Sequence, residues 1–379
     1  MNLKKLTASV LIAVMAFSAS AFAADKKDET ETKTVITYDK AVEMAIKNTS
    51  SLKTIDEAVE LMEDNKEMLF TSLNGYLPLS GVSHQVESSI GNLLESIGSI
   101  DGSTKSYKYK KIMLKETAEL MVKNYFNTIV TSEKSLELAK ESLVLKQREC
   151  NELIAKNKLG MVSDNELDTA KNEVTTLQQN VKMAELAIDN VYDELANAIG
   201  LKVGEEFEID YEITYEPLTI TTSLESYITV KSQSDPSVLA AKADVESADF
   251  QKKVSITDDT PYSYEEKTNA LNAADRTYGD TVKNIKTSIL NGYNTIMQLE
   301  SKEKTLQTAL DDAKRTYDTA KTNFEVGNIT QLKLDQASLA VKNAENDLLS
   351  NASSHDLLVF QFNHPYMLSG SGSGADAGK

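Results

Sequence analysis

The side chains that usually carry out catalysis or bind metals are few and scattered in this chain of 379 residues. The three histidines, His84, His355 and His364, lack the spacing of a metal site, and the sequence has no glycine-rich phosphate loop or nucleophile signature. The single cysteine, Cys150, lies among apolar residues of a predicted helix, which is typical of a core position rather than of a reactive thiol. We therefore predict that the protein is not an enzyme and that it uses no metal or cofactor.

Charged residues are the other candidates for chemistry, and acidic ones dominate. The chain has 58 Asp and Glu against 40 Lys and Arg, which gives a formal net charge of −18. Nucleic acid and anionic membrane surfaces bind clustered positive charge, so neither is an expected partner. The acidic side chains are most simply explained as solvated faces of helices, and a polar face that lines an aqueous channel is the alternative.

The two ends of the chain have compositions that predict segments separate from the folded part. Lys4 and Lys5, the apolar run Leu6–Phe17 and the alanine-bounded site Ala21–Ala23 have the layout of a secretory signal peptide. We therefore predict that residues 1–23 are removed on export. Residues 365–379 contain alternating serine and glycine and are predicted to form a flexible tail.

Long helices must position the side chains between these ends. Only 15 glycines and 5 prolines occur in the chain, and no proline occurs at positions 79–216 or 262–364. Along both intervals, apolar or alanine side chains recur at alternating spacings of three and four, which is the narrow seam of a coiled coil. The predicted seams are Leu136, Ala139, Leu143, Cys150 and Leu153, then Leu167, Ala170, Val174, Leu177, Val181, Ala184, Ile188, Val191, Leu195 and Ala198, then Leu306, Ala309, Ala313, Tyr317, Ala320 and Phe324, and finally Leu334, Ala337, Val341, Ala344 and Leu348.

Each of these intervals is broken once by a matching turn, at residues 158–163 and 325–330. Gly160 and Gly327 can take the left-handed conformation that ends a helix. Ser163 and Thr330 can then cap the next helix through their hydroxyls, and Ser163 with Glu166 forms a capping box. The sequence therefore predicts two long antiparallel helical hairpins.

The two hairpins belong to a tandem repeat. Gly160 and Gly327 are 167 residues apart, while the segments from Tyr38 and Leu224 match at an offset of 186, so the first copy has 19 extra residues between about Phe70 and Thr104. Between the copies, apolar residues alternate with polar ones from 207 to 215, which predicts a strand. The predicted segments are 24–203 for the first repeat, 204–221 for a β-containing connector and 222–364 for the second repeat.

The order of these features resembles the TolC family of outer membrane efflux proteins. Tyr38–Asn48 is similar to the opening segment of that family, Gly160–Ser163 followed by Leu167–Ala170 is similar to its helix-turn pattern, and Phe324–Gly327 matches the second turn. The resemblance covers nearly the whole mature chain. It implies a mainly α fold and a homotrimer whose helices form a hollow cylinder. It also implies partners, namely an envelope adaptor (membrane fusion) protein and an inner-membrane transporter.

One departure from the family concerns its membrane β-strands. The family inserts two strands between the helices of each repeat, and such a strand needs about nine to eleven alternating residues. Residues 254–264 offer only Val254 and Ile256 before a polar turn with a proline. In the first copy Val82, Val86 and Ile90 lie an even number of residues apart, so they would face the same side of a strand. However, polar residues interrupt that apolar face. We therefore expect a divergent member with a short β connector and at most a reduced β region.

Two sets of site residues follow from the resemblance. Relatives narrow their entrance with acidic residues about two turns beyond the second hairpin turn, but this chain departs from them, since the matching positions hold Lys333 and Gln336 and Asp335 is only adjacent. These three residues are the candidate lumen constriction, and the family's carboxylate gate is not carried over to them. The hairpin turns are predicted to bind the partner, although their apolar residues could instead staple the two helices together. This partner-binding set is Gly160, Met161, Val162, Ser163, Gly327, Asn328, Ile329 and Thr330.

Two functions are consistent with the sequence. The first is a passive trimeric helical duct in an envelope export or efflux system, located in the outer membrane or periplasm of a cell with two membranes. The second is a secreted or surface coiled-coil structural protein that has lost conduction. The retained turns favour the first function, and the missing strands favour the second.

Overall fold

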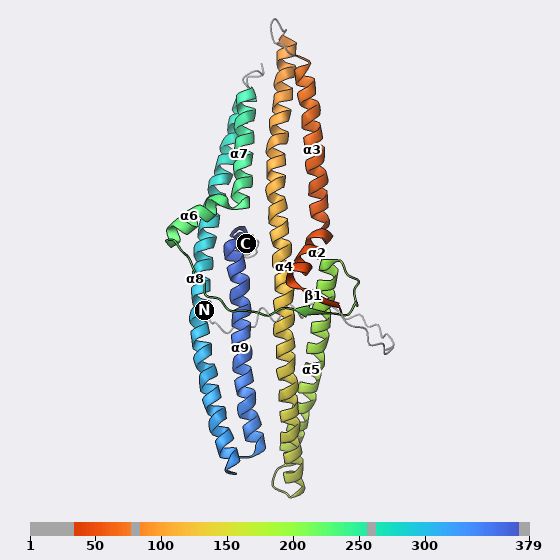
Figure 1. The fold of residues 1–379 in the computed structure, drawn as a ribbon, viewed down its shortest axis with the longest axis vertical. Coiled ribbons are helices and arrows are strands. Elements are labelled where there is room, and N and C mark those ends of the chain that lie inside the picture. The colour runs from red at the N-terminus through yellow and green to blue at the C-terminus, as the bar shows by residue number, and fades with distance from the viewer. Residues whose placement is uncertain (1–33, 77–83, 256–262, 371–379) are drawn as a thin grey trace. The chain divides into compact units, whose positions relative to one another are not determined.

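The computed structural model describes residues 34–76, 84–255 and 263–370, which form a mainly helical chain (Figure 1). The mainly α fold predicted from the sequence is confirmed. The predicted signal peptide and residues 371–379 of the predicted tail lie outside the described residues. The elements are β1 (Thr34–Thr37), α2 (Tyr38–Asn48), α3 (Ser50–Asn74), α4 (His84–Lys158), α5 (Asp164–Ile199), β2 (Phe207–Asp210), α6 (Leu224–Ser234), α7 (Pro236–Val254), α8 (Ser263–Glu325), α9 (Gln331–Asn363) and α10 (Tyr366–Gly370).

The helices repeat in order, so that α6, α7, α8 and α9 correspond to α2, α3, α4 and α5. Both α2 and α6 have 11 residues. However, α3 has 25 residues where α7 has 19, and α4 has 75 where α8 has 63. Most of the extra residues of the first copy therefore lengthen the α3/α4 hairpin.

By its internal contacts the described chain divides into two compact units. The first unit contains residues 34–41, 122–214 and 301–353, and the second contains residues 42–121, 215–300 and 354–370. The long helices α4, α8 and α9 contribute residues to both units.

In the first unit, β1 and β2 form a two-stranded parallel sheet in which Thr34 pairs with Phe207. The alternation that predicted a strand from 207 to 215 persists as alternating burial, but the strand ends at Asp210 because β1 offers only four residues for pairing. The Tyr38, Phe126 and Tyr211 rings pack on one another with centroids 5.4 to 5.8 Å apart. This aromatic cluster joins the sheet to α4.

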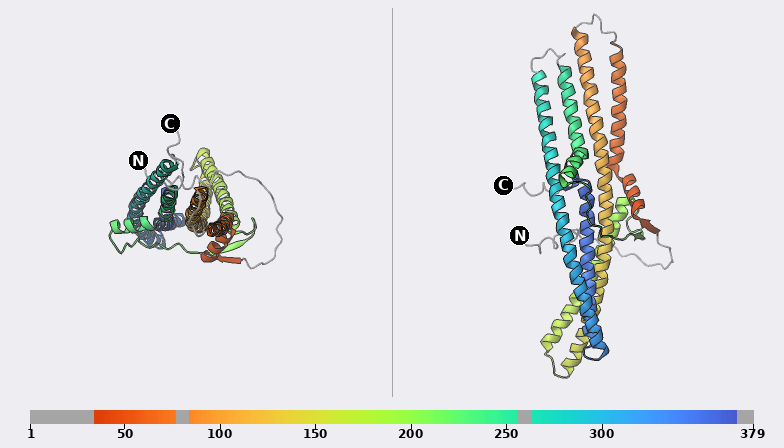
Figure 2. Two further views of the ribbon diagram at one scale, coloured as in Figure 1. Left: turned by 90° about the horizontal axis from the view of Figure 1, so that it is seen from above. Right: turned by 60° about the vertical axis from the view of Figure 1, so that its left-hand side comes forward.

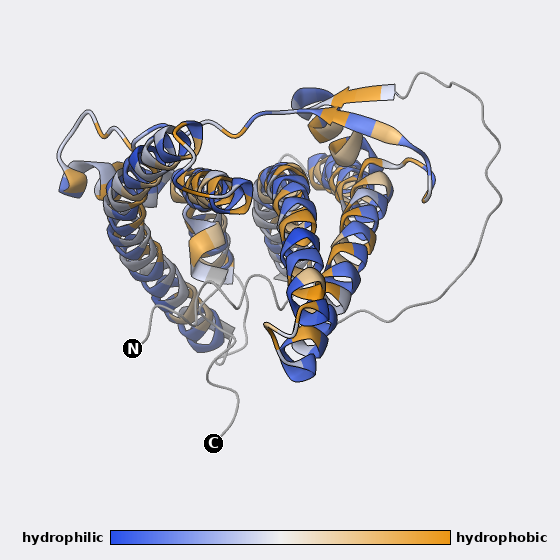
Figure 3. Cartoon of the chain, turned by 90° about the horizontal axis from the view of Figure 1, so that it is seen from below, coloured by the Kyte–Doolittle hydropathy of each residue, from blue (hydrophilic) through white to orange (hydrophobic). Residues whose placement is uncertain are grey.

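The coiled-coil seams of the first unit follow the predicted spacing closely. Every predicted seam residue of α5 is buried or half-buried. In α8 the predicted Ala309 is exposed, and Leu310 is buried in its place. The larger side chain takes the seam position, which leaves the alternating four and three spacing intact from Leu306 to Phe324. Figure 3 shows the resulting mixture of apolar and polar residues along the helices.

The second unit is held by an apolar core and by close helix approach. Its buried residues are Val238, Ile285, Ile289, Ile296 and Phe362. The N-terminal half of α4 runs against α7, where a Cβ added at Gly98 would lie 2.1 Å from the Phe250 ring and one at Gly102 would lie 2.5 Å from Ser247 Cβ. The close approach of α4 and α7 therefore depends on glycine at position 102, and a side chain at position 98 would displace the Phe250 ring.

Two expectations about the ends of the hairpins can be compared with the structure. Val86 and Ile90, which would face the same side of a strand, lie instead in the first turns of α4. Val82 and Ile256 lie outside the described residues. Tyr366–Gly370, at the start of the predicted tail, form α10.

No described helix contains an apolar stretch long enough to cross a membrane.

Candidate functional site at the hairpin turns

The two hairpin turns have the same backbone geometry. Gly160 has a φ of +70° and Gly327 a φ of +79°, both in the left-handed region. After Gly160, the Met161 N–H donates to the Lys156 carbonyl at 2.9 Å, and after Gly327 the Asn328 N–H donates to the Asn323 carbonyl at 2.8 Å. This is the Schellman pattern, which satisfies carbonyls at the end of a helix. A Cβ at either glycine would meet nothing within 4 Å, so the backbone conformation and not the space requires glycine.

The residues after each glycine cap the outgoing helix. Ser163 Oγ accepts from the Glu166 N–H, and Glu166 Oε2 accepts from the Ser163 N–H at 3.0 Å, so the predicted capping box is present. Hydrogen bonds from the backbone and hydroxyl of Ser163 lower the pKa of Glu166. At the second turn, Thr330 Oγ1 accepts from the Lys333 N–H at 3.4 Å. Lys333 stands where the first copy has Glu166, so the second turn lacks the reciprocal half of the box.

Contacts between α4 and α9 join the two hairpins within the first unit. Arg148 forms an ion pair with Asp335, and Gln336 donates to Glu149 at 2.8 Å. Further from the turns, Lys342 pairs with Glu141. Since these residues lie at similar sequence distances from Gly160 and Gly327, both turns lie at the same end of the first unit (Figure 1).

The predicted constriction residues take part in these contacts. Lys333 is exposed, Asp335 is half-buried and also accepts from Gln331 at 2.7 Å, and Gln336 is exposed. Sequence analysis singled out Asp335 and Gln336 but missed their partners on the other hairpin, Arg148 and Glu149. The heptad spacing carries no signal for these pairs, because they lie outside the seam of either hairpin.

The apolar residues of the turns divide into two groups. Met161 is 70% exposed, and it is joined by Leu159 and Val326, which are 75% and 65% exposed and which sequence analysis left out. Val162 and Ile329 are half-buried. The Val162 carbonyl also accepts from Asn157 Nδ2 at 3.1 Å, so this part of the turn is held in place.

The remaining members of the predicted partner-binding set are polar or have no side chain. Gly160, Ser163, Gly327, Asn328 and Thr330 are all exposed.

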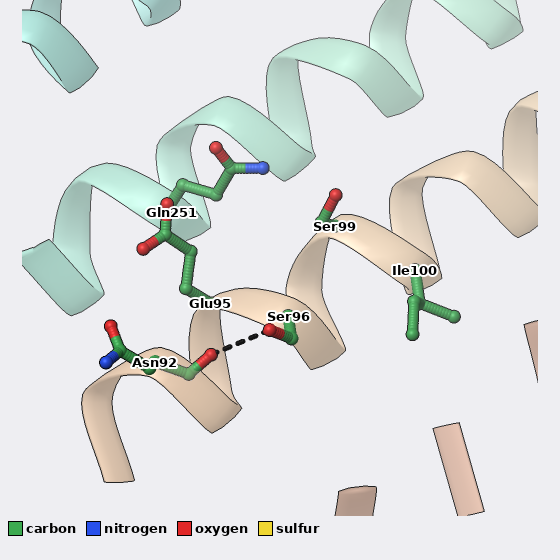
Figure 4. Close-up of a pocket in the computed structure, with 6 residues that line it drawn as sticks. All are labelled: Asn92, Glu95, Ser96, Ser99, Ile100 and Gln251. Carbon is green, nitrogen blue, oxygen red and sulfur yellow. Dashed lines mark hydrogen bonds between the residues drawn. The ribbon is translucent and has the colours of Figure 1, made fainter. Parts of the chain in front are cut away.

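Two pockets lie elsewhere among the described residues, both in the second unit. A polar pocket of about 450 Å³ in the second unit is lined by Asn92, Glu95, Ser96, Ser99, Ile100 and Gln251 (Figure 4). Its only acidic residue, Glu95, pairs with Lys267. A pocket of about 260 Å³ lies at the end of α9, where His364 Nε2 faces Glu116 Oε1 at 3.8 Å. Within the described part of the chain, no three His, Cys, Asp or Glu side chains form a metal site.

Residues 263–356, which contain α8, the second turn and most of α9, match the family model described as outer membrane efflux protein. The predicted resemblance to the TolC family is confirmed. Lys333, Asp335 and Gln336 lie within the matched residues, and the first turn lies outside them. No curated protein sequence matches the chain.

Solved structures share the TolC-like fold over most of the chain. The Campylobacter jejuni CmeC outer membrane channel is 12% identical and has a TM-score of 0.67, and the alignment covers 94% of each chain. The Vibrio cholerae outer membrane protein VceC is 12% identical with a TM-score of 0.64, over 86% of this chain and 96% of VceC. The open-state Neisseria gonorrhoeae MtrE outer membrane channel is 12% identical with a TM-score of 0.58, over 86% and 88%.

Proposed function

We propose that this protein is a passive, trimeric, TolC-like duct in an envelope export or efflux system. In this proposal the helices surround the conduit, the hairpin turns dock to an adaptor protein, and a transporter supplies the energy. The protein itself contributes shape and a polar passage, with no catalysis and no cofactor. Its place is the cell envelope, which it reaches through the predicted signal peptide.

The observation that carries this proposal is the pair of structurally equivalent turns at one end of the first unit. Leu159, Met161 and Val326 expose apolar surface there. Such side chains tend to be covered by a partner when they gather on one surface. Because glycine and capping contacts hold both turns in one conformation, docking would need little reordering of the backbone.

The half-buried and exposed residues of the turns are proposed to have different roles. Met161 and Val326 are exposed and are available to a partner helix. Val162 and Ile329 are half-buried and are proposed to staple the two helices of each hairpin. The docking and packing interpretations of the turns thus apply to different side chains.

Assembly into a trimer is supported by surface that one chain leaves uncovered. In the first unit, Val144 of α4 and Met183 and Leu186 of α5 are large apolar side chains with roughly half or more of their surface exposed. The seams of the hairpins are also narrow, so each hairpin buries little surface alone. We propose that neighbouring copies cover these side chains.

The contacts between α4 and α9 are proposed to set the width of the conduit near the turns. Lys333, Asp335 and Gln336 form the proposed constriction. The ion pair of Asp335 with Arg148 and the hydrogen bond of Gln336 with Glu149 fix these side chains relative to the other hairpin.

Capture by the adaptor tests the docking surface. The mature chain and a Met161→Asp, Val326→Asp variant would each be co-purified with the envelope adaptor of the same cell. We expect the variant to lose capture at least tenfold while its helicity and melting midpoint stay unchanged, because exposed side chains contribute little to the core.

An Ile329→Asp variant is the matched control. It should lower the melting midpoint, because a charge would enter a half-buried position. Unchanged capture by the Met161→Asp, Val326→Asp variant would refute docking at the turns. A stable monomer found in the culture medium would favour the secreted structural protein instead.

A further inference from the structure

The pocket of about 260 Å³ at the end of α9 is formed by four elements of the second unit. In Figure 2 the end of α9 lies beside α6, and there Lys231 Nζ donates to the Asn363 carbonyl at 3.2 Å. Ile112 of α4, Leu239 of α7 and Pro365 after α9 give the pocket apolar walls. Pockets for drug-sized ligands have volumes of about 300–1,000 Å³, so this pocket suits a smaller molecule.

The hydrogen on the His364 ring is placed by the preceding turn of α9. Nδ1 lies 2.9 Å from the Phe360 carbonyl oxygen, which can only accept a hydrogen bond, so Nδ1 carries a hydrogen. In the neutral ring the other nitrogen, Nε2, is then an acceptor. Nε2 faces Glu116 Oε1 at 3.8 Å, and the two side chains are only 25% and 23% exposed. Two hydrogen-bond acceptors therefore face each other in the lining of the pocket.

This pair of acceptors is short of a donor among the described residues. Glu116 Oε2 is buried and has no hydrogen-bond partner there. The ammonium of Lys231, which also lines the pocket, is held by the Asn363 carbonyl and lies 6.0 Å from the centroid of the Tyr227 ring. A buried carboxylate is costly to desolvate unless a donor compensates it. The lining is thus suited to a ligand that brings donors.

The charges of the lining favour a cation. The charged residues are two carboxylates, Glu116 and Asp235, and one ammonium, Lys231, so one negative charge is left over while the imidazole is neutral. Asp235 is 2% exposed and already accepts from the Tyr366 N–H at 3.0 Å. The carboxylate available to a ligand is therefore that of Glu116.

We propose that this pocket binds a small organic cation in which a primary ammonium group is attached to an apolar body. The ammonium has three donors, so it donates to Glu116 Oε1 and His364 Nε2 together. The apolar body packs against Ile112 and Leu239. Binding of this kind goes beyond the proposed duct, and it depends neither on the trimer nor on adaptor docking.

Isothermal titration calorimetry of the mature protein with phenethylamine tests the site, because this amine is protonated at neutral pH and carries one apolar ring. We expect saturable binding with a dissociation constant on the order of 1 mM or below. Phenethyl alcohol and phenylacetate have nearly the same shape but are neutral and anionic. Each should bind at least roughly tenfold more weakly, because the alcohol lacks the charge and Glu116 repels the anion.

Two variants remove the acceptors one at a time. Glu116→Gln should weaken binding of phenethylamine at least roughly tenfold, because a charge-assisted hydrogen bond is lost. His364→Asn keeps an N–H that can donate to the Phe360 carbonyl but lacks Nε2, and it should weaken binding about threefold. Circular dichroism checks that the variants fold, and His364→Asn decides the question if Glu116→Gln does not.

The matched control is Glu119→Gln on the next turn of α4, which removes the same charge outside the lining of the pocket. It should bind phenethylamine as the wild type does. An equal loss of binding in this control would overturn the proposal, since it would indicate general attraction to an acidic chain.

Two results with the ligands would also overturn the proposal. The first is the absence of saturable binding of phenethylamine, which would leave a bridging water as the donor between Glu116 and His364. The second is equal binding of the amine, the alcohol and the anion, which would show that only the apolar walls bind the ligand.

Discussion

At the residue scale, one backbone conformation decides each hairpin turn. Gly160 and Gly327 have a positive φ and open space around them, so a side chain there is disfavoured by its own backbone and by nothing else. The neighbouring caps differ, because Glu166 completes a capping box and Lys333 cannot. The backbone N–H groups of the first turn are therefore better satisfied by hydrogen bonds than those of the second turn.

Alanine at either turn glycine should destabilise the chain. We expect Gly160→Ala and Gly327→Ala each to lower the free energy of unfolding by about 1 kcal/mol, because alanine resists the left-handed conformation. Gly279→Ala is the control, since Gly279 lies inside α8 with nothing within 4 Å of an added Cβ. It should raise the free energy by roughly 0.5 kcal/mol. Urea denaturation followed by circular dichroism measures the free energy of unfolding of all three variants. Equal effects at the three glycines would show that the left-handed conformation is not the cause.

A second residue-scale prediction concerns Asp101, whose pKa is lowered chiefly by the hydrogen bond from Lys66 on α3. A lowered pKa in the folded state adds stability above the unfolded pKa, about 3.9 for Asp, and that stability is lost as the pH falls through the folded value. Asp101→Asn should therefore melt below the wild type at pH 7, and the difference should shrink as the pH falls below the unfolded pKa and through the lower folded one, which thermal melts at several pH values would measure.

At the element scale, the helices pair in two ways. Within each hairpin the seams join α4 to α5 and α8 to α9 through apolar side chains. Between the hairpins, α4 meets α9 through polar contacts, which include Arg148 with Asp335 and Asn127 Nδ2 with the Ser353 carbonyl at 3.4 Å. Polar contacts of this kind add less stability than a seam but specify which helix faces which.

The Arg148–Asp335 pair can be measured against its repeat equivalent. Arg315 occupies the position of Arg148 in the second copy, but it pairs with Asp312 on its own helix. We expect a double-mutant cycle on Arg148 and Asp335 to give a coupling of about 0.5–1 kcal/mol, and the Arg315–Asp312 cycle to give less. Of the two arginine variants, only Arg148→Ala should also broaden the distribution of distances between spin labels on α4 and α9. A narrow distribution in that variant would show that the pair does not set the spacing of the hairpins.

At the scale of the whole molecule, the tandem repeat provides two hairpins with narrow seams and several exposed apolar side chains. Light scattering on the mature protein at micromolar concentration should give three times the mass of one chain. Met183→Asp, Leu186→Asp should shift the protein toward the monomer, because both side chains are large and exposed in one chain. A wild-type monomer would argue against the duct.

The sequence by itself determined the helices, the two turns and the repeat, because glycine conformation, hydroxyl caps and seam spacing depend on residues close together in the chain. It even located the extra length of the first copy. Only the tertiary structure decided which helices of different hairpins face each other, so the pairing of Arg148 with Asp335 could not be read from either hairpin. The exposure of Leu159 and Val326 was decided there too, because exposure depends on which neighbours cover a side chain.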